Sequence, residues 1–385
     1  MTADAVIYLA TASDISVAQH RVAGRPVVFR AVAAAVRGGA RRVFVPLALR
    51  ELLVPALPSA PRVARAVSWL DATTPLPSAA LLIPATAVLG PGAVAATLVA
   101  SAPAVHRGAR DAGAPLVNAG PGILAALWSA LAAGAPVGDA LAKIAADPAL
   151  TVVRDSALVH RVTDADSAAV AERRLYTTLG SAIDTKLDTV FHRRFSRLVS
   201  RVAVARGLTP NTVTVMSLVV GLVAAWCFWN ASPAAAVAGL ALYAAAVILD
   251  HADGEIARLT LTESAIGEWL DLAADTVTHV AVVLALGVTS QAVAGSGAAF
   301  GVIAALGFVA SAAVAKAWPA VAMPDRIGTA ISGLGNRDGF YAMLIAFIVS
   351  RTYWPDALPW LMIVVAAGSH AFWIGRALYR LTRGA

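Results

Sequence analysis

Acidic residues gather in one stretch of this otherwise apolar sequence, which reads DHADGEIARLTLTESAIGEWLDLAAD. Asp250, Asp253 and Arg258 follow at helical spacing and share one face of a predicted helix. Asp271 and Asp275 share a face of the next predicted helix. An aspartate at the centre of a membrane helix costs roughly 2.5 to 3.5 kcal/mol. A group of them therefore requires a wet cavity and shared cations.

The chemistry that these carboxylates suit is the binding of hard cations. Oxygen ligands without cysteine or clustered histidine are the donor set that Mg²⁺ and Mn²⁺ prefer. Two such ions fit among four carboxylates, and a two-metal site is well suited to displacement at phosphorus. The alternative is a pair of buried helices with ion-paired acids, but one arginine cannot balance four aspartates.

The complete pattern, D-x-x-D-G-x-x-A-R-x8-G-x3-D-x3-D, resembles the signature of the CDP-alcohol phosphotransferase (CDP-alcohol phosphatidyltransferase) family. The resemblance implies an enzyme that transfers a substituted phosphate from a CDP-linked alcohol to an acceptor hydroxyl and releases CMP. It also implies that Asp250, Asp253 and Asp271 are chiefly metal ligands. Asp275 would take the proton of the acceptor hydroxyl and can also contact the second metal ion.

The same resemblance implies a binding site for the CDP group. It is formed by Gly254, Ala257, Arg258, Gly267 and, at the start of the first span, Asn211. Glycine lets a nucleotide approach the backbone, and a guanidinium suits phosphate oxygens. Helix packing is an alternative explanation for both glycines. Helix capping by Thr209 or Asn211 explains the TPNTVT string nearly as well.

The composition indicates a membrane protein. The 385 residues are 59% hydrophobic and only 14% charged, and the net charge is +7. Positive charge beside apolar spans favours an anionic membrane surface over nucleic acid as its partner. The single cysteine, Cys227, excludes a disulfide framework and a thiolate metal site. The first residues show no cleavable signal peptide, so we expect the N-terminal part to remain in the cytoplasm.

Residues 1–165 alternate short apolar runs with helix-like segments. This rhythm predicts a soluble, Rossmann-like α/β domain with a mainly parallel sheet. The stretch AGRPVVFRAVAAAVRGGARRVFV resembles part of the sugar-nucleotidyltransferase fold. Active members have a glycine-rich loop after the first strand and later a metal-binding aspartate, whereas residues 5–23 contain no glycine and Ala85 and Thr86 replace that aspartate. We expect a degenerate domain with a scaffolding or regulatory role; an active nucleotidyltransferase is the alternative.

The order of the two domains resembles that of the bifunctional inositol-1-phosphate cytidylyltransferase and di-inositol-phosphate phosphate synthases. Asp184, Lys186 and Asp188, followed by FHRRFSRLVSR, support this resemblance. It implies inositol chemistry, with CDP-inositol or CDP-diacylglycerol as donor and an alcohol such as inositol phosphate as acceptor. Family members commonly pair as homodimers, which the resemblance extends to this chain.

Residues 166–206 are predicted to form a linker and a basic amphipathic helix, over 182–206, at the membrane interface. A solvated linker helix is the alternative. Residues 207–385 follow as the membrane domain. Six apolar segments predict six transmembrane helices, at 211–231, 233–258, 264–289, 296–316, 337–351 and 356–379.

The positions of the basic residues predict the topology. The loops assigned to the inside and the tail hold Arg258, Lys316, Arg326, Arg337, Arg376, Arg380 and Arg383, whereas the outer loops hold essentially Arg351. Both ends and the active site would then face the cytoplasm from the inner cell membrane. Lys316, Arg326 and Arg337 are candidates for binding the acceptor phosphate, with Arg337 the best. Ordinary positive-inside bias explains any one of them about as well.

Two other classes of function are alternatives. A cation-coupled transporter also places acids in a membrane, but it should show acids near the midplane and internal repeats, which this sequence lacks. A catalytically dead membrane scaffold is disfavoured because every expected catalytic position is occupied.

Overall fold

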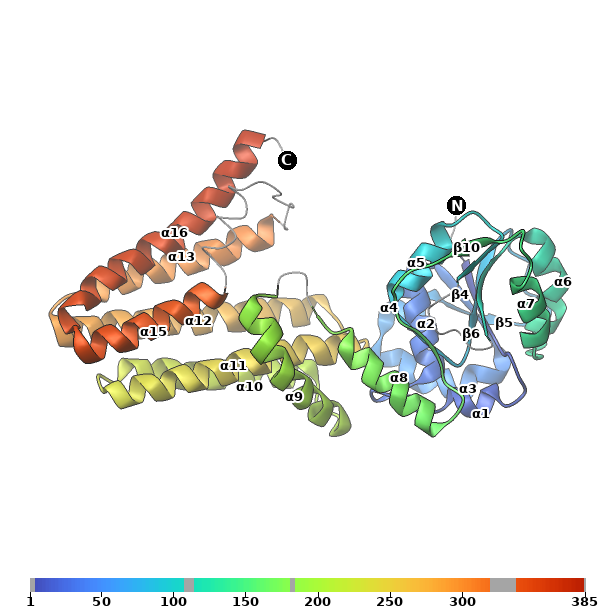
Figure 1. The fold of residues 1–385 in the computed structure, drawn as a ribbon, viewed down its shortest axis with the longest axis horizontal. Helices are drawn as coiled ribbons and strands as arrows, with labels where there is room; N and C mark the ends of the chain where they lie inside the picture. The colour runs from blue at the N-terminus through green and yellow to red at the C-terminus, as the bar shows by residue number, and fades with distance from the viewer. Residues whose placement is uncertain (1–3, 107–113, 181–183, 319–336, 384–385) are drawn as a thin grey trace. The chain divides into compact units, whose positions relative to one another are not determined.

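The computed structural model describes residues 4–106, 114–180, 184–318 and 337–383. The chain divides into two compact units (Figure 1). The first comprises Met1–Leu179 and Leu259–Thr262, and the second comprises Gly180–Arg258 and Glu263–Ala385.

The first unit is built on a seven-stranded sheet in the order β10-β8-β9-β6-β1-β4-β5. Its strands are β1 (Asp4–Tyr8), β4 (Arg42–Pro46), β5 (Val67–Leu70), β6 (Ala80–Pro84), β8 (Ala104–His106), β9 (Leu116–Ala119) and β10 (Thr151–Val153). Strand β1 pairs in parallel with β4 and β6, and only β9 is antiparallel to its neighbours in this sheet. The predicted α/β fold with a mainly parallel sheet is therefore confirmed.

Both faces of this sheet are buried. In β1, Ala5 and Ile7 belong to one hydrophobic cluster, whereas Val6 and Tyr8 belong to another, because successive strand side chains point to opposite faces. Helix α2 covers the first face and helices α6 and α7 cover the second. The helices of this unit are α1 (Asp14–Ala18), α2 (Val27–Arg37), α3 (Arg50–Leu53), α4 (Pro61–Ala66), α5 (Pro91–Val99), α6 (Pro121–Ala132), α7 (Gly138–Ala145) and α8 (Ala165–Thr177).

Smaller elements complete the unit. Two-stranded pairs join β2 (Arg21–Val22) to β3 (Arg25–Pro26) and β7 (Ala87–Leu89) to β11 (Val159–Arg161), and 3₁₀ turns lie at Leu47–Leu49 and Val54–Ser59. Hydrogen bonds to Asp14, the first residue of α1, close the loop after β1. Its Oδ2 accepts the backbone N–H of Ala10 at 2.7 Å, and its Oδ1 accepts a hydrogen bond from the Thr11 hydroxyl. The amide of Ala10 is thus already satisfied, which agrees with the absence of a glycine-rich phosphate loop.

The second unit is helical. A π-helical turn, η3 (Asp188–His192), leads into α9 (Arg193–Ala205), and α10 (Pro210–Trp229), α11 (Pro233–Thr260), α12 (Ala265–Ala294), α13 (Ala298–Ala317), α15 (Arg337–Tyr353), a 3₁₀ turn at Pro355–Ala357 and α16 (Leu358–Arg383) follow. Among the described residues, five helices are long and apolar enough to cross a membrane, as in a multi-pass membrane protein. The 17 residues of α15 span only about 25 Å, so a sixth transmembrane helix stays a prediction.

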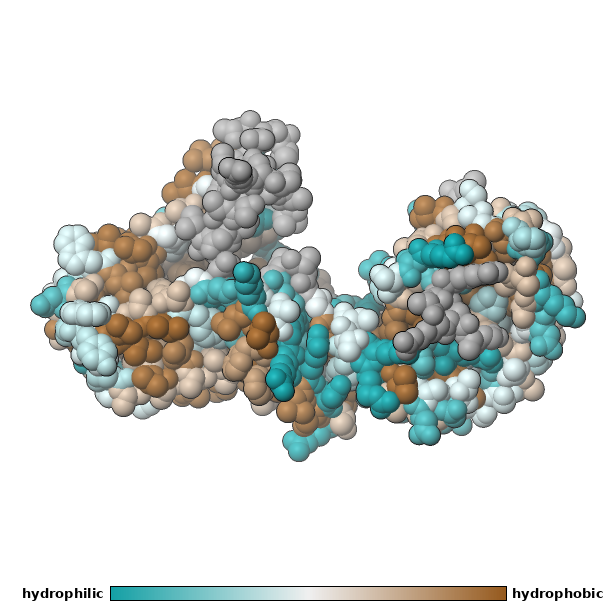
Figure 2. Space-filling view, in the orientation of Figure 1, coloured by the Kyte–Doolittle hydropathy of each residue, from teal (hydrophilic) through white to brown (hydrophobic). Residues whose placement is uncertain are grey.

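Small residues let these helices approach closely. A Cβ atom on Gly221 of α10 would lie 2.6 Å from Thr278 of α12, and one on Gly287 of α12 would lie 2.8 Å from Gly301 of α13. Such contacts are typical of membrane helices, where packing replaces the hydrophobic effect. Large apolar side chains such as Val219 on α10 instead remain exposed, and Figure 2 shows apolar surface over this helical unit. That surface suits contact with lipid.

Candidate metal and donor site

Three of the four predicted aspartates come together. One carboxylate oxygen each from Asp250 and Asp253 of α11 and Asp271 of α12 lie within 4.8 Å of one another. Helices α11 and α12 are joined by a short turn in which Leu261 has a positive φ of 61°, so the end of one helix lies beside the start of the next. The turn thus brings distant positions of the signature into one cluster.

Hydrogen bonds orient this cluster. Asp253 is buried, and its Oδ2 accepts the hydroxyl of Thr214 from α10 at 2.5 Å. Ser264 caps the start of α12 by accepting the N–H of Gly267, which fixes the helix that carries Asp271. Three helices therefore determine where the carboxylates point.

The donor set fits a hard divalent cation. It consists of carboxylate oxygens alone, and the three acids are close enough to share one ion. Without a cation the like charges repel one another at this distance. Asp271 is exposed while Asp253 is buried, so the cluster is open on one side. Ligand exchange and substrate approach both require such an opening.

Asp275 lies outside this three-carboxylate group. Its Oδ1 is 3.3 Å from Nδ1 of His279, one helical turn further along α12. Nε2 of His279 is 3.0 Å from the hydroxyl of Tyr243, so the imidazole is held from both sides. Asp275 therefore has an imidazole partner, and its carboxylate still interacts electrostatically with Asp250 and Asp271.

The residues predicted to bind CDP lie on both signature helices and on α10. A Cβ atom on Gly254 would lie 3.5 Å from the guanidinium of Arg258, so that side chain folds along the glycine. A Cβ atom on Gly267 would lie 3.3 Å from Oδ1 of Asn211. Asn211 and Gly267 are thus neighbours although they belong to different helices. Ala257 lies between Gly254 and Arg258 on α11.

The basic residues predicted to bind an acceptor phosphate differ in their surroundings. Lys316 pairs with Glu268 at 2.8 Å and lies over the ring of Trp269. Arg337 instead contacts the metal cluster, with Nη2 3.0 Å from Oδ2 of Asp250. Arg326 lies outside the described residues.

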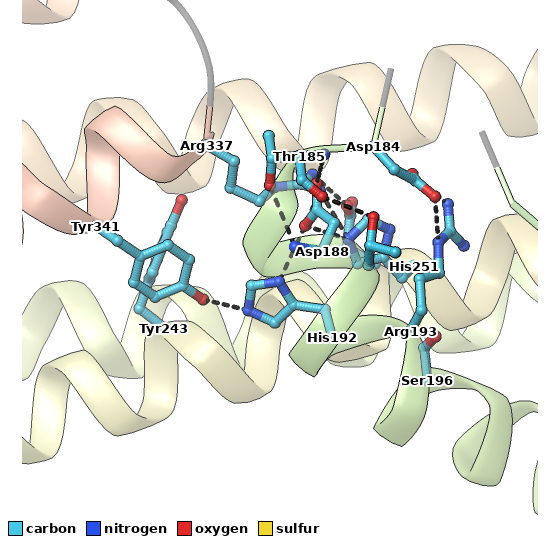
Figure 3. Close-up of polar contacts among 12 residues, drawn as sticks. Asp184, Thr185, Asp188, His192, Arg193, Ser196, Tyr243, His251, Arg337 and Tyr341 are labelled. Atoms are coloured by element: carbon cyan, nitrogen blue, oxygen red, sulfur yellow. Dashed lines mark hydrogen bonds and ion pairs between the residues drawn. The ribbon is translucent and has the colours of Figure 1, made fainter. Parts of the chain in front are cut away.

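A buried polar network surrounds Asp188 and was not predicted from the sequence (Figure 3). Oδ1 of Asp188 accepts Nδ1–H of His192 at 2.9 Å, and Nε2 of His251 and Nη1 of Arg337 lie 2.8 and 3.3 Å away. His192 Nε2 contacts the hydroxyl of Tyr341. Burial raises the pKa of Asp188, but the hydrogen bonds from both histidines and the Thr185 N–H, together with the charge of Arg337, outweigh it and hold that pKa well below its usual range. The helical spacing of Asp188 and His192 was the available signal.

A second buried network joins α9 to α11. Glu255 is fully buried, and its Oε1 accepts Nη1–H of Arg193 at 3.0 Å and the Ser196 hydroxyl at 2.8 Å. Its Oε2 accepts the Ser200 hydroxyl, while Arg193 donates two further hydrogen bonds to Asp184. The inner face of α9 is therefore polar. An acid inside the apolar α11, directly after the signature glycine, was the signal for this contact.

Comparison with known proteins gives a match to the helical unit. Residues 207–368 match the family model described as CDP-alcohol phosphatidyltransferase. The chain is 43% identical over 82 residues to the CDP-diacylglycerol–serine O-phosphatidyltransferase of Mycobacterium leprae (strain TN), a match that covers 21% of this chain and 26% of that protein. The matched segment thus spans about a quarter of that curated relative.

Among solved structures, the chain is similar to the Mycobacterium tuberculosis phosphatidylinositol phosphate synthase in complex with manganese and citrate. The two are 23% identical with a TM-score of 0.37, and the match covers 49% of this chain and 89% of the other. The family model covers all four aspartates, Arg258 and the two glycines of the signature. Through residues 207–368, this chain carries a domain of the CDP-alcohol phosphatidyltransferase family.

Proposed function

We propose that this protein is a membrane-embedded, metal-dependent enzyme that transfers a substituted phosphate from a CDP-alcohol to an acceptor alcohol and releases CMP. The observation that supports this most strongly is the approach of the carboxylates of Asp250, Asp253 and Asp271 to within 4.8 Å. These acids lie on the helices that also carry Gly254 and Gly267, where a nucleotide can approach the backbone.

Asp250, Asp253 and Asp271 would hold Mg²⁺ or Mn²⁺, and Asp275 would join them if a second ion binds. When bound, the divalent cations withdraw negative charge from the phosphorus that is attacked. Thr214 holds Oδ2 of Asp253 by its hydrogen bond, which orients this carboxylate within the cluster.

Asp275 is the proposed general base. It lies one helical turn from Asp271 and outside the three-carboxylate group, so it can face the acceptor hydroxyl instead of being fully engaged in metal binding. His279 contacts its carboxylate and is itself held by Tyr243, which restricts the orientation of Asp275. A base within hydrogen-bond reach of the hydroxyl would take its proton as the new ester bond forms.

The CDP group is proposed to lie along Gly254, Ala257, Arg258, Gly267 and Asn211. Arg258 would bind phosphate oxygens through its planar fork. The donor is CDP-diacylglycerol or CDP-inositol, and the acceptor is an alcohol such as inositol phosphate, whose phosphate Arg337 or Lys316 would bind. Residues 1–165, which lie within the first unit, are proposed to have a scaffolding or regulatory role, because hydrogen bonds to Asp14 close the loop after β1.

Membrane placement is proposed from the surface of α9. Phe195 and Leu198 lie on its outward side and are 43% and 60% exposed, and Phe191, just before it on η3, is 42% exposed. Because the inner side is polar and already bound to Glu255, the apolar side is left to enter the lipid interface. We infer that α9 lies on the cytoplasmic surface of the inner cell membrane, and that the protein acts as a homodimer.

Release of CMP tests the proposal. The purified protein would be supplied with CDP-diacylglycerol or CDP-inositol, each with inositol phosphate or glycerol phosphate, with Mn²⁺ or with EDTA. We expect metal-dependent CMP release with one donor and acceptor pair. Release that needs no acceptor would indicate a hydrolase, and the absence of CMP in every combination would contradict the proposed function.

A further inference from the structure

Side chains from three parts of the helical unit contact the carboxylate of Asp188, which takes no part in the proposed chemistry. His192 follows it on η3, His251 comes from α11 and Arg337 from α15. Asp188 is only 2% exposed, and its second oxygen accepts the N–H of Thr185. A carboxylate this deeply buried must be balanced by positive charge or by several hydrogen bonds.

The balancing charge comes from Arg337. Atoms of Asp188, His192 and His251 lie within 4.8 Å of one another, a spacing that can also hold a metal ion. However, Nη1 of Arg337 lies 2.8 Å from Nε2 of His251 and 3.3 Å from Oδ1 of Asp188. A guanidinium at that distance would repel a second cation. The network therefore fits an arginine better than a metal.

His251 cannot hold Arg337 and Asp188 at the same time. Its Nε2 carries either one proton or one lone pair, so it donates to Asp188 or accepts from Arg337. In both arrangements the charge of Asp188 stays beside Nη1. The electrostatic attraction of Asp188 therefore fixes this end of the guanidinium, whichever tautomer His251 adopts.

The other end of the guanidinium contacts the proposed metal cluster, because Nη2 lies 3.0 Å from Oδ2 of Asp250. An arginine on a metal ligand competes with the cation for that ligand. We propose that Asp188 is a positioning residue: it holds Arg337 by one nitrogen and shares its charge, which weakens the hold of Arg337 on Asp250 and lets Asp250 bind a divalent cation. This inference rests on the proposed function, since it assumes that Asp250 binds metal.

The charges give the direction of the effect. In Asp188→Asn, Asp250 and Asp275 are left to balance Arg337, so the guanidinium binds Asp250 more tightly and repels the incoming cation. We expect Mn²⁺ to bind about tenfold more weakly, at the low end of the effects seen when partners of metal ligands are lost. Arg337→Gln removes the competitor and should bind Mn²⁺ at least as tightly as the wild type. The double variant should resemble Arg337→Gln.

Electron paramagnetic resonance of free Mn²⁺, titrated with purified protein in detergent, measures these affinities without any turnover. Asp184→Asn is the matched control, because Asp184 lies on the same segment but pairs with Arg193. We expect it to leave the Mn²⁺ affinity within about twofold of the wild type. Equal affinities of Asp188→Asn and the wild type, or a double variant as weak as Asp188→Asn, would overturn the proposal.

Thermal unfolding without metal separates this inference from the proposed function. Asp188→Asn should lower Tm more in the wild type than in the Arg337→Gln background, and additive shifts would contradict the pairing even if no Mn²⁺ binds. A wild type that neither binds Mn²⁺ nor releases CMP contradicts the proposed function instead. If Asp188→Asn does not fold, Asp188→Glu keeps the charge and should bind Mn²⁺ within about threefold of the wild type; a tenfold loss there would count against the role of charge.

Discussion

Nη2 of Arg337 lies 3.0 Å from Oδ2 of Asp250, which links the first turn of α15 to a predicted metal ligand on α11. The two residues are 87 positions apart in the sequence. The contact places a basic residue directly beside the three-carboxylate group, where it can help to balance the acids and can also reach an anionic substrate. The net charge around the three-carboxylate group therefore depends on these acids and on Arg337, and substituting any of them should have a predictable effect.

Replacing Asp275 with asparagine separates proton transfer from metal binding. Because Asp275 lies outside the group formed by Asp250, Asp253 and Asp271, we expect the Mn²⁺ affinity to change by less than about threefold. The rate of CMP release should fall at least about a hundredfold, as is typical when a general base is lost. A parallel fall of Mn²⁺ affinity and rate would show instead that Asp275 is chiefly a metal ligand.

The hydrogen bond from Thr214 to Asp253 should tune the metal site. Thr214→Val keeps the shape of the side chain but removes the donor that lies 2.5 Å from Oδ2 of Asp253. We expect Mn²⁺ to bind roughly tenfold more weakly, in line with the loss of other outer contacts to metal ligands. Thr212→Val is the control, because Thr212 is exposed and its hydroxyl contacts the cap residue Thr209 and not a carboxylate of the cluster. Unchanged affinity in Thr214→Val would contradict this role.

The network around Arg193 predicts an order of stabilities. Arg193→Met leaves Asp184 and Glu255 without their shared cation and should destabilise the helical unit by about 3 to 5 kcal/mol. Glu255→Gln still leaves Arg193 paired with Asp184 and should cost less, about 1 to 3 kcal/mol. Thermal unfolding in detergent measures both. The reverse order would mean that Glu255 has other partners that matter more.

Close packing of α12 and α13 makes Gly287 intolerant of a side chain. A Cβ atom there would lie 2.8 Å from Cα of Gly301, so Gly287→Ala must push the helices apart. We expect a cost of about 1 to 3 kcal/mol and a lower Tm. Gly368→Ala is the matched control, since a Cβ atom on Gly368 would meet nothing within 4 Å. Equal Tm values for the two variants would contradict the packing described for this helix pair.

The sequence predicted the elements that depend on local pattern. Alternating apolar runs predicted the sheet of the first unit, and the spacing of the aspartates predicted that two helices would bring acids together. The pairings around Asp188 and Glu255 were not predictable in the same way. They join residues 149 and 62 positions apart, and only the tertiary packing of the helices decides which partner each buried acid meets.

Asp275 illustrates another limit of the sequence. Its spacing from Asp271 places both on one face of α12, yet the structure groups only Asp271 with Asp250 and Asp253. An α-helix has 3.6 residues per turn and rises about 5.4 Å per turn, so residues one turn apart can face different partners. Asp275 also contacts the local His279, which is held by Tyr243 and which the pattern of acids does not contain.

The most direct test of the central claim is CMP release by the wild type and by Asp253→Asn, both measured with saturating Mn²⁺ and a CDP-alcohol. Asp253 is the buried member of the three-carboxylate group, so its loss should remove the metal and lower the rate at least about a hundredfold. We expect metal-dependent release by the wild type and almost none by Asp253→Asn, although the variant remains folded. Equal release by the two proteins would contradict the claim.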